Sequence, residues 1–338
     1  MTAYAGIDLH SNNIYMAIID HNNNRLFGKR LPNKLPLITK ALLPFKKEIS
    51  DIAVESTYNW YWLVDGLADE GYNMHLSNPA ASKQYEGIKY GDDKTDAFWL
   101  AQMLMLGILP EGYIYPREQR YTRDLLRRRL LYVKQRTTHI LSLESMVSRS
   151  LGTHISANKV KKLDPDDAKE LFSQKHQAVA GSHAIATINF LSERVGLIEK
   201  EVMENARLKP EFKQLLTTPG IGNVLATTIM YEVGTISRFK KAGNYASYSR
   251  CVKSEKISNK KKKGAGNRKN GNKYLSWAYI EAANAAIRHY PAFQRFYNRK
   301  LSRTKPVVAR KAVANKLARA TFYIMRDQVA YDEKIMFG

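Results

Sequence analysis

The chain has 338 residues and a formal net charge of +23, so its length predicts two domains with a connecting element and its charge predicts a polyanionic partner. No stretch reaches the roughly 18 to 20 apolar residues that a membrane span needs, and no signal peptide is visible, which predicts a cytoplasmic protein without a membrane partner. The single cysteine, Cys251, excludes an internal disulfide and a cysteine-cluster metal site, and we expect a buried or idle thiol there.

The N-terminal residues predict a sheet. Residues 3–9, 14–20 and 25–31 are rich in β-forming side chains and are separated by short polar turns, which predicts a meander of three antiparallel strands. The elements expected next are a helix at 37–47, a strand at 52–55, a helix at 59–70, a strand at 74–77 and a helix at 92–106. This order predicts a mixed α/β sheet of the ribonuclease-H-like class.

Four carboxylates fall where this fold would hold a metal site. Asp8 lies inside the apolar first strand and Glu55 ends the fourth, while Asp93 and Asp96 share one face at the start of the 92–106 helix. Buried acids without partners are costly, and a pair of divalent cations is the natural compensation. Two such ions about 4 Å apart can activate an attacking oxygen and stabilise a leaving one at phosphorus.

Each acid also has a purely structural explanation. Asp8 could cap a turn, Glu55 could pair with a lysine, and the two helix acids could cap the helix N-terminus. Asp92 is an alternative to Asp93 in the set, although the shared helical face favours Asp93. The metal-site interpretation depends on the four acids as a set, in strand, strand, helix order beside a basic region.

The middle of the chain predicts a pair of long helices. Residues 117–151 have a charged helical pattern, and a second helix is expected from about 183 to 208, with apolar residues spaced by three, four or seven. The pair is typical of a coiled-coil-like stalk, interrupted by the polar segment 153–176. Such stalks commonly join protomers, and an intramolecular helical hairpin stays open as the alternative.

Nearly all of the positive excess lies in the C-terminal part. From residue 206 onward, 28 Lys and Arg residues stand against 7 Asp and Glu. That asymmetry is typical of a nucleic-acid-binding surface, because each neutralised phosphate releases counterions, while a basic surface kept for solubility is the alternative. The turn at 219–222 joins two helical patterns and predicts a helix-hairpin-helix that binds DNA near Gly220 and Gly222; a plain connecting turn is the alternative.

Residues 251–270 carry eight basic groups and one acid, with glycines that favour close approach of the backbone to phosphates. The nucleic-acid-binding residues expected in this segment are Lys260, Lys261, Lys262, Lys263, Arg268 and Lys269. Ser258 has a positive neighbourhood that would help to bind a scissile phosphate, but composition alone favours an ordinary loop serine there.

Several motifs, in order along nearly the whole chain, resemble one family. They are GIDLH near the start, AVESTYNWYWL, SNPAASKQ followed by DDKTDAFWLAQML, TTPGIG, and SNKKKKGAGNRKNGNKYL. Their combination resembles the transposases of insertion-sequence family 110 and the related Piv-type invertases. The resemblance implies a RuvC-like N-terminal domain whose acidic tetrad, here Asp8, Glu55, Asp93 and Asp96, holds magnesium, as two ions and with manganese as an alternative.

The resemblance also implies a C-terminal transposase domain whose serine becomes covalently joined to DNA. Ser258 best matches the family's serine-glycine motif, although Lys260 stands where glycine is expected, and Ser254 is the reserve candidate. Members of the family look like bacterial or archaeal, nucleoid-associated oligomers, dimers or tetramers, that combine the acidic domain of one protomer with the serine of another. They use a guide RNA from the noncoding end of the element to choose target and donor DNA.

These interpretations predict three regions: a RuvC-like metal-binding catalytic domain at 1–115, a helical stalk at 116–208 and a basic transposase domain at 209–338. The expected function is that of a transposase or site-specific recombinase that excises and integrates an insertion sequence, with the element ends and the target as its DNA partners. One alternative is a metal-dependent Holliday-junction resolvase or nuclease without a protein nucleophile. The other is a non-catalytic nucleic-acid-binding protein.

Overall fold

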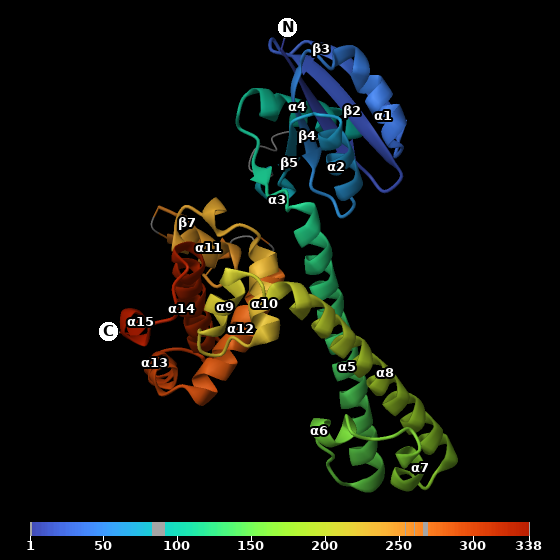
Figure 1. The fold of residues 1–338 in the computed structure, drawn as a ribbon, viewed down its shortest axis with the longest axis vertical. Helices are drawn as coiled ribbons and strands as arrows, with labels where there is room; N and C mark the ends of the chain where they lie inside the picture. The colour runs from blue at the N-terminus through green and yellow to red at the C-terminus, as the bar shows by residue number, and fades with distance from the viewer. Residues whose placement is uncertain (1, 83–91, 254, 260, 266–269, 338) are drawn as a thin grey trace. The chain divides into compact units, whose positions relative to one another are not determined.

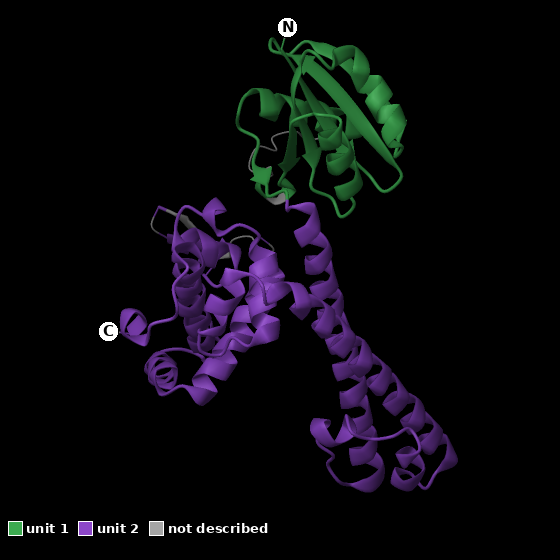
Figure 2. Cartoon of the chain, viewed as in Figure 1, with its two compact units in different colours: residues 1–114 green, residues 115–338 purple. Residues whose placement is uncertain are grey.

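The computed structural model describes residues 2–82, 92–253, 255–259, 261–265 and 270–337. They form two compact units, residues 1–114 and residues 115–338 (Figure 2). Unit 1 holds a mixed sheet and unit 2 is mostly helical, which confirms the α/β N-terminal part and helical remainder that the sequence predicts. Among the described residues, no helix is at once long enough and apolar enough to span a membrane.

Unit 1 is a six-stranded sheet with helices on both faces. Its elements are β1 (Ala3–Leu9), β2 (Asn13–Asp20), β3 (Arg25–Pro32), α1 (Leu35–Leu42), η1 (Leu43–Phe45), β4 (Ile49–Glu55), α2 (Tyr61–Asp69), β5 (Met74–Ser77), α3 (Pro79–Ser82), α4 (Asp93–Met105) and β6 (Glu111–Gly112). The strand order is β3-β2-β1-β4-β5-β6. Strands β1 to β3 form the antiparallel meander, and β4 runs parallel to β1 and to β5. This sheet fits a ribonuclease-H-like domain.

The two faces of the sheet carry different side chains, because successive residues of a strand point to opposite faces. Ile7 lies in the apolar core that α1 and α2 cover with Ile38 and Leu63. Gly6 and Asp8 belong to the opposite face, which α4 covers (Figure 1). The acid of β1 therefore lies on the side of the sheet where α4 begins with its own acids.

Gly6 lets α4 approach β1 closely. A Cβ atom on Gly6 would lie 2.1 Å from the carbonyl oxygen of Ala97 and 2.6 Å from the backbone nitrogen of Ala101, so only glycine fits. Asp93 precedes Ala97 by about one helical turn, and Asp8 follows Gly6 by two residues along β1. The close packing of helix on strand therefore carries Asp93 toward Asp8.

Unit 2 consists almost entirely of helices (Figure 1). Its elements are α5 (Arg117–Leu151), α6 (Ala157–Val160), α7 (Asp167–Leu171), α8 (Lys175–Ala206), α9 (Pro210–Leu216), α10 (Asn223–Val233), η3 (Ile236–Arg238), α11 (Ala242–Tyr248), β7 (Glu255–Ser258), β8 (Lys261–Ala265), α12 (Lys273–His289), α13 (Pro291–Leu301), α14 (Pro306–Asp327) and α15 (Glu333–Phe337). The β7–β8 hairpin was not expected, because its lysine-rich sequence has low strand propensity.

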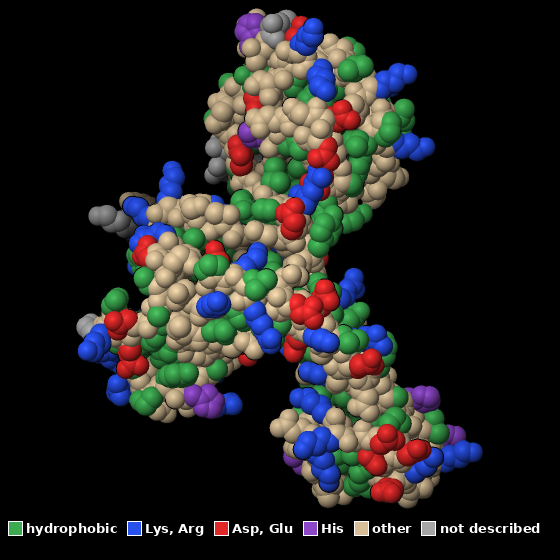
Figure 3. Space-filling view, viewed as in Figure 1, with side chains coloured by type: hydrophobic (Ala, Val, Ile, Leu, Met, Phe, Trp, Pro, Cys, Tyr) green, Lys and Arg blue, Asp and Glu red, His purple; other side chains and the backbone are tan. Residues whose placement is uncertain are grey.

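Helices α5 and α8 run side by side as two long helices (Figure 1). The first has the bounds that the sequence predicts, whereas α8 starts at Lys175, earlier than expected. Ile140 and Val147 of α5 form a core with Ile185 of α8 and with Phe172 from the intervening segment. On the face drawn in Figure 3, acidic side chains gather near α7 beside lysines, so this end of the helix pair presents mixed charge. That the α5 and α8 pair forms a coiled-coil stalk remains a prediction.

The C-terminal helices pack around α12 and α14. The hydroxyl groups of Tyr245 and Tyr279 are 2.6 Å apart, and Tyr279 lies at the same distance from the hydroxyl of Thr321, so the buried polar groups satisfy one another. Cys251 lies in this core, where burial raises the pKa of its thiol to about 12, and the expectation of a buried thiol is confirmed.

Candidate active site

Three of the predicted acids converge in unit 1. Asp8 on β1 is 3% exposed, and Glu55 at the end of the adjacent parallel strand β4 is half-buried. A hydrogen bond joins the carboxyl groups of Asp8 and Glu55. Asp93, the first residue of α4, lies across from them and is also half-buried. Side chains from two strands and one helix therefore meet at one end of the sheet.

His10 lies between the two aspartates, and sequence reasoning missed it. Its Nε2 atom is 3.1 Å from Oδ2 of Asp8 and 3.2 Å from Oδ1 of Asp93. This nitrogen is buried from solvent between the two carboxylates. One ligand atom from each of the three side chains lies within 4.8 Å of the others. The two-residue spacing from Asp8 in an extended segment could have revealed it.

Arg30 on β3 orients Asp93. Its Nη2 donates a hydrogen bond to Oδ2 of Asp93 at 2.5 Å, while Nη1 donates to Oδ1 of Asn13 at 2.8 Å. The hydrogen bond from Arg30 holds the pKa of Asp93 below its usual value, and the charge on His10 acts in the same direction, against the effect of burial. Asp93 is therefore a charged carboxylate whose second oxygen, Oδ1, faces His10.

The two strand acids show the opposite effect. Burial raises the pKa of Asp8, despite the hydrogen bond from Glu55. Burial, the hydrogen bond with Asp8, and the negative charges of Asp8 and Asp96 together raise the pKa of Glu55 to about 7. Like charges crowded in a partly desolvated place destabilise their ionised forms. A positive ion bound between them would relieve that repulsion.

The structure separates the roles of the neighbouring acids in α4. Asp92 is exposed and caps the helix, since its Oδ1 accepts a hydrogen bond from the backbone N–H of Thr95 at 2.7 Å. Asp93 is the neighbour that faces His10. Asp96 is exposed in the same first turn, and its charge still acts on Glu55.

The donor set suits a divalent metal ion. Carboxylate oxygens of Asp8, Glu55 and Asp93 are hard ligands of the kind that magnesium and manganese prefer, and an imidazole nitrogen such as that of His10 is compatible with manganese. The ligand atoms of Asp8, His10 and Asp93 lie within 4.8 Å of one another, close enough to share one ion. The residues present therefore fit such an ion.

The predicted nucleic-acid-binding residues lie in unit 2, in two places. Gly220 has φ +80°, and a Cβ atom there would lie 2.2 Å from the carbonyl oxygen of Ala282 in α12, so close packing explains this glycine. Gly222 is exposed immediately before α10. Lys261 and Lys263 are exposed on β8.

Other predicted residues of the lysine segment are only partly described. The backbone of Ser258 ends β7 and pairs with Lys261, and Lys262 lies on β8, but the side chains of Ser258 and Lys262 are not among those described. Residues Ser254, Lys260, Arg268 and Lys269 lie outside the described residues.

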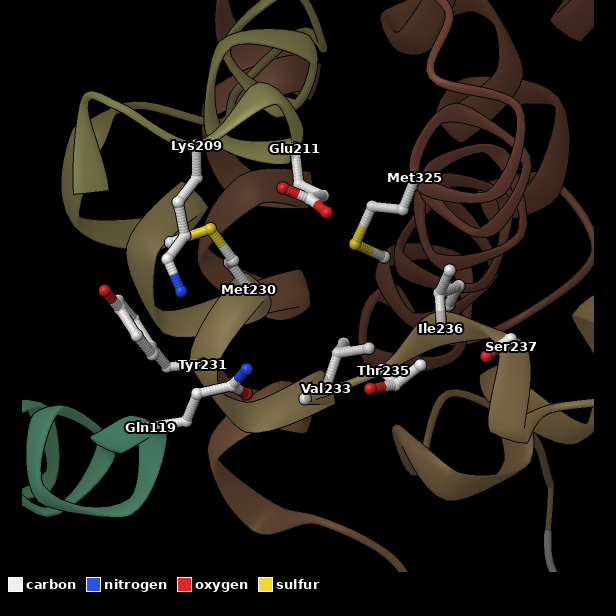
Figure 4. Close-up of a pocket in the computed structure, with 11 residues that line it drawn as sticks. Gln119, Lys209, Glu211, Met230, Tyr231, Val233, Thr235, Ile236, Ser237 and Met325 are labelled. Carbon is white, nitrogen blue, oxygen red and sulfur yellow. The ribbon is translucent and has the colours of Figure 1, made fainter. Parts of the chain in front are cut away.

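A separate pocket of about 210 Å³ lies within unit 2 (Figure 4). Its lining includes Lys209, Glu211, Tyr231 and Met325, and the ammonium group of Lys209 stacks on the ring of Tyr231 at 4.9 Å. One ammonium, one carboxylate and apolar groups do not form the cluster of acids that phosphoryl chemistry requires. We therefore do not include this pocket in the candidate site.

Comparison with known protein families gives matches to two regions of the chain. A transposase model for the acidic DEDD domain of the IS110 group matches residues 5–150, which contain all four predicted acids. A second model, described as Transposase IS116/IS110/IS902 family, matches residues 213–298, which contain the β7–β8 hairpin. A search of curated proteins found no match. The two models together cover about two thirds of the chain, and a DEDD domain indicates use of divalent metal. The chain belongs to the IS110 family of transposases and is a DNA transposase.

Proposed function

We propose that this transposase cuts and rejoins DNA through a serine nucleophile, Ser258, and two magnesium ions held by the tetrad Asp8, Glu55, Asp93 and Asp96. The observation that carries the proposal is the cluster of Asp8, His10 and Asp93, with Glu55 hydrogen-bonded to Asp8, although the three acids are far apart in the sequence. In this reading the enzyme excises and integrates an insertion sequence, and its DNA partners are the element ends and the target.

The acids differ in their contribution to the site. Asp8 is the buried anchor, Asp93 is held in place by Arg30, and His10 is an additional nitrogen ligand beside them. Glu55 and Asp8 would hold the cation together, and the positive charge would favour the ionised form of Glu55 in place of its hydrogen bond to Asp8. Bound metal supplies Lewis-acid stabilisation of charge on the phosphate oxygens.

The covalent step exchanges one phosphodiester for another. The Oγ atom of Ser258 bonds to phosphorus while the bond from phosphorus to one deoxyribose oxygen breaks, and the serine proton ends on that leaving oxygen. Attack by a hydroxyl group of a second DNA strand reverses these changes and frees the serine. Lys261 and Lys263, exposed on β8, supply positive charge near the hairpin for the DNA phosphates.

The partners follow from the same family resemblance. We propose a guide RNA from the noncoding end of the element and a homo-oligomer, a dimer or a tetramer. Exposed Leu131 and Leu141 on α5, and Phe190 and Leu197 on α8, support association through a stalk at 116–208. The basic excess after residue 206 supports binding of two nucleic acids by a transposase domain at 209–338.

The turn between α9 and α10 supports a helix-hairpin-helix in that domain. Two helices flank it, and the exposed Gly222 leaves the N-terminal backbone of α10 open to a phosphate. Gly220 would serve this module through its packing on α12 rather than through contact with DNA.

Trapping of a protein–DNA adduct tests the proposal. Purified enzyme, with its RNA, is mixed with nicked element-end DNA that prevents rejoining, and covalent product is measured after denaturation. Ser258→Ala should abolish the adduct and spare DNA binding, while Ser254→Ala, the matched control, should form it normally. Cleavage by the wild-type enzyme without any adduct would support the alternative, a metal-dependent resolvase or nuclease that uses water.

A further inference from the structure

We propose that Arg127, Glu232 and Asn272 form a positioning relay that ties the two ends of the segment 250–272, which carries the β7–β8 hairpin, to helix α5. The inference rests on the proposed role of Ser258, which lies in that hairpin. None of the three residues belongs to the acidic tetrad or to the lysine segment. They come from α5, α10 and the residue before α12, and all lie in unit 2.

Glu232 is the centre of the relay. It is 1% exposed near the end of the apolar helix α10, where a charge requires close partners. Arg127 provides them in a two-pronged contact, with Nε 2.6 Å from Oε1 and Nη2 2.8 Å from Oε2. The guanidinium of Arg127 also stacks 4.4 Å from the centre of the Tyr274 ring. This geometry fixes the direction of both side chains.

Asn272 connects this ion pair to the end of the lysine segment. Its Nδ2 donates to Oε2 of Glu232 at 2.7 Å. Its Oδ1 accepts from the backbone N–H groups of Tyr274 at 2.8 Å and Leu275 at 3.1 Å, which caps helix α12. The Glu232 carboxylate thus holds Asn272 in the orientation that the cap requires, and the chain has one fixed point where it enters α12.

The entry point of the same segment is fastened to its exit. Arg250 has φ +55°, and its Nε donates to the carbonyl oxygens of Asn270 and Gly271, both at 3.0 Å. Gly271 has φ +84°, and a Cβ atom there would lie 2.4 Å from the carbonyl oxygen of Tyr248. The segment that carries Ser258 therefore starts and ends at one place, and Asn272 ties that place to Glu232 and Arg127.

A nucleophile within a segment takes its position from the points where that segment is anchored. Displacement of a reacting group by about 1 Å can slow a reaction up to about a hundredfold. Arg127, Glu232 and Asn272 act through the hairpin, so they are positioning residues. Their loss should slow formation of the serine–phosphate bond more than it weakens binding of DNA.

The substitution Asn272→Ser tests the hydrogen bond from Asn272 to Glu232 separately from the cap of α12. Serine keeps a side-chain oxygen that caps α12 but removes the donor to Glu232. Asn189→Ser is the matched control, because it removes an amide bond to the carbonyl oxygen of Leu163 in the α5–α8 region. Adduct formation is followed in single turnover over a range of DNA concentrations. We expect the maximal rate to fall on the order of tenfold in Asn272→Ser, with unchanged half-saturating DNA, at a temperature where both variants are fully folded. Asn189→Ser should keep the wild-type rate.

Arg127→Lys gives a second measurement. It keeps the positive charge but cannot form the two-pronged contact, so it should lower the same rate without moving half-saturation. A wild-type rate in Asn272→Ser, or a loss of rate that only follows a loss of Tm in both variants, would overturn the relay. If wild-type enzyme forms no adduct at Ser258, the proposed function fails, which is a distinguishable result.

Discussion

Two of the buried carboxylate sites in the described part of the chain compensate their charge in different ways. In unit 2, Glu232 receives hydrogen bonds from the guanidinium of Arg127 and the amide of Asn272, so its charge is compensated within the protein. In unit 1, Asp8 and Glu55 share a hydrogen bond with each other, and the pKa of Glu55 is raised to about 7.

The difference distinguishes a structural acid from one prepared for a ligand. A carboxylate with its own cation holds elements together, and removal of one partner leaves an unpaired buried charge. Acids that repel each other weaken the free protein and become favourable when a cation arrives. On this reasoning, changes at Asp8 should affect the reaction, whereas changes at Glu232 should affect stability first.

The largest effect is expected for Asp8→Asn. Loss of this anchor should lower metal-dependent strand cleavage by at least about a thousandfold, because charge on the phosphate is no longer stabilised. Asp92→Asn is the matched control, since Asp92 only caps α4 and asparagine caps equally well. Cleavage assays in magnesium measure both variants, and equal loss in the two would contradict the assignment.

The next effect concerns the structural acid. Glu232→Ala should lower the free energy of unfolding by about 3 kcal/mol, because Arg127 then keeps only the distant, more exposed Asp124 as its acidic partner. Asp166→Ala removes an exposed ion pair with Lys169 and should change the free energy of unfolding far less. Urea unfolding measures the free energy of unfolding of both variants. Similar losses in the two would show that the buried network contributes no more to stability than an exposed ion pair.

The contact between α4 and β1 should be nearly as sensitive. Gly6→Ala places a methyl group against the backbone of α4 and should lower the free energy of unfolding by about 2 to 3 kcal/mol. It should also weaken metal binding, because Asp93 moves away from Asp8. Gly196→Ala, in open space on α8, should be neutral or slightly stabilising. Normal metal affinity in Gly6→Ala would show that the close packing of α4 on β1 is not needed to position Asp93 for the metal.

The smallest effect is expected at His10. His10→Ala removes one nitrogen ligand and should weaken manganese binding about tenfold while the acids still hold the ion. His21→Ala, at the exposed turn after β2, serves as the control. Electron paramagnetic resonance of manganese reports both affinity and nitrogen coordination. An unchanged nitrogen signal in His10→Ala would exclude it as a ligand.

Much of the fold can be predicted from local patterns. The β1–β3 meander is recognisable from its β-forming residues and polar turns, α4 from its apolar run after the capping Asp92, and α5 from its helical period. The early start of α8 at Lys175 escapes prediction, since its first residues have no apolar period and tertiary packing at Gly181 stabilises them. The β7–β8 hairpin is not predicted either, because lysine has a low propensity for β-strands.

The sequence predicts the acids of the candidate site but not the residues that surround them. Asp8, Glu55 and Asp93 are visible as acids at the ends of expected elements. His10 is missed when histidines are searched only for spacings among themselves, and Arg30 is missed because β3 joins the site through sheet pairing. In the sequence, Glu232 is one of many charged residues in helices. Only the fold shows that its side chain is buried.

Direct titration with manganese tests the central claim, that the clustered acids of unit 1 bind a divalent cation. Binding to the wild-type protein and to a variant with both Asp8→Asn and Asp93→Asn is measured without DNA, and magnesium is added as a competitor. We predict saturable binding that magnesium displaces in the wild type and that is lost in the variant, with circular dichroism unchanged. Equal binding by the two proteins would contradict the account.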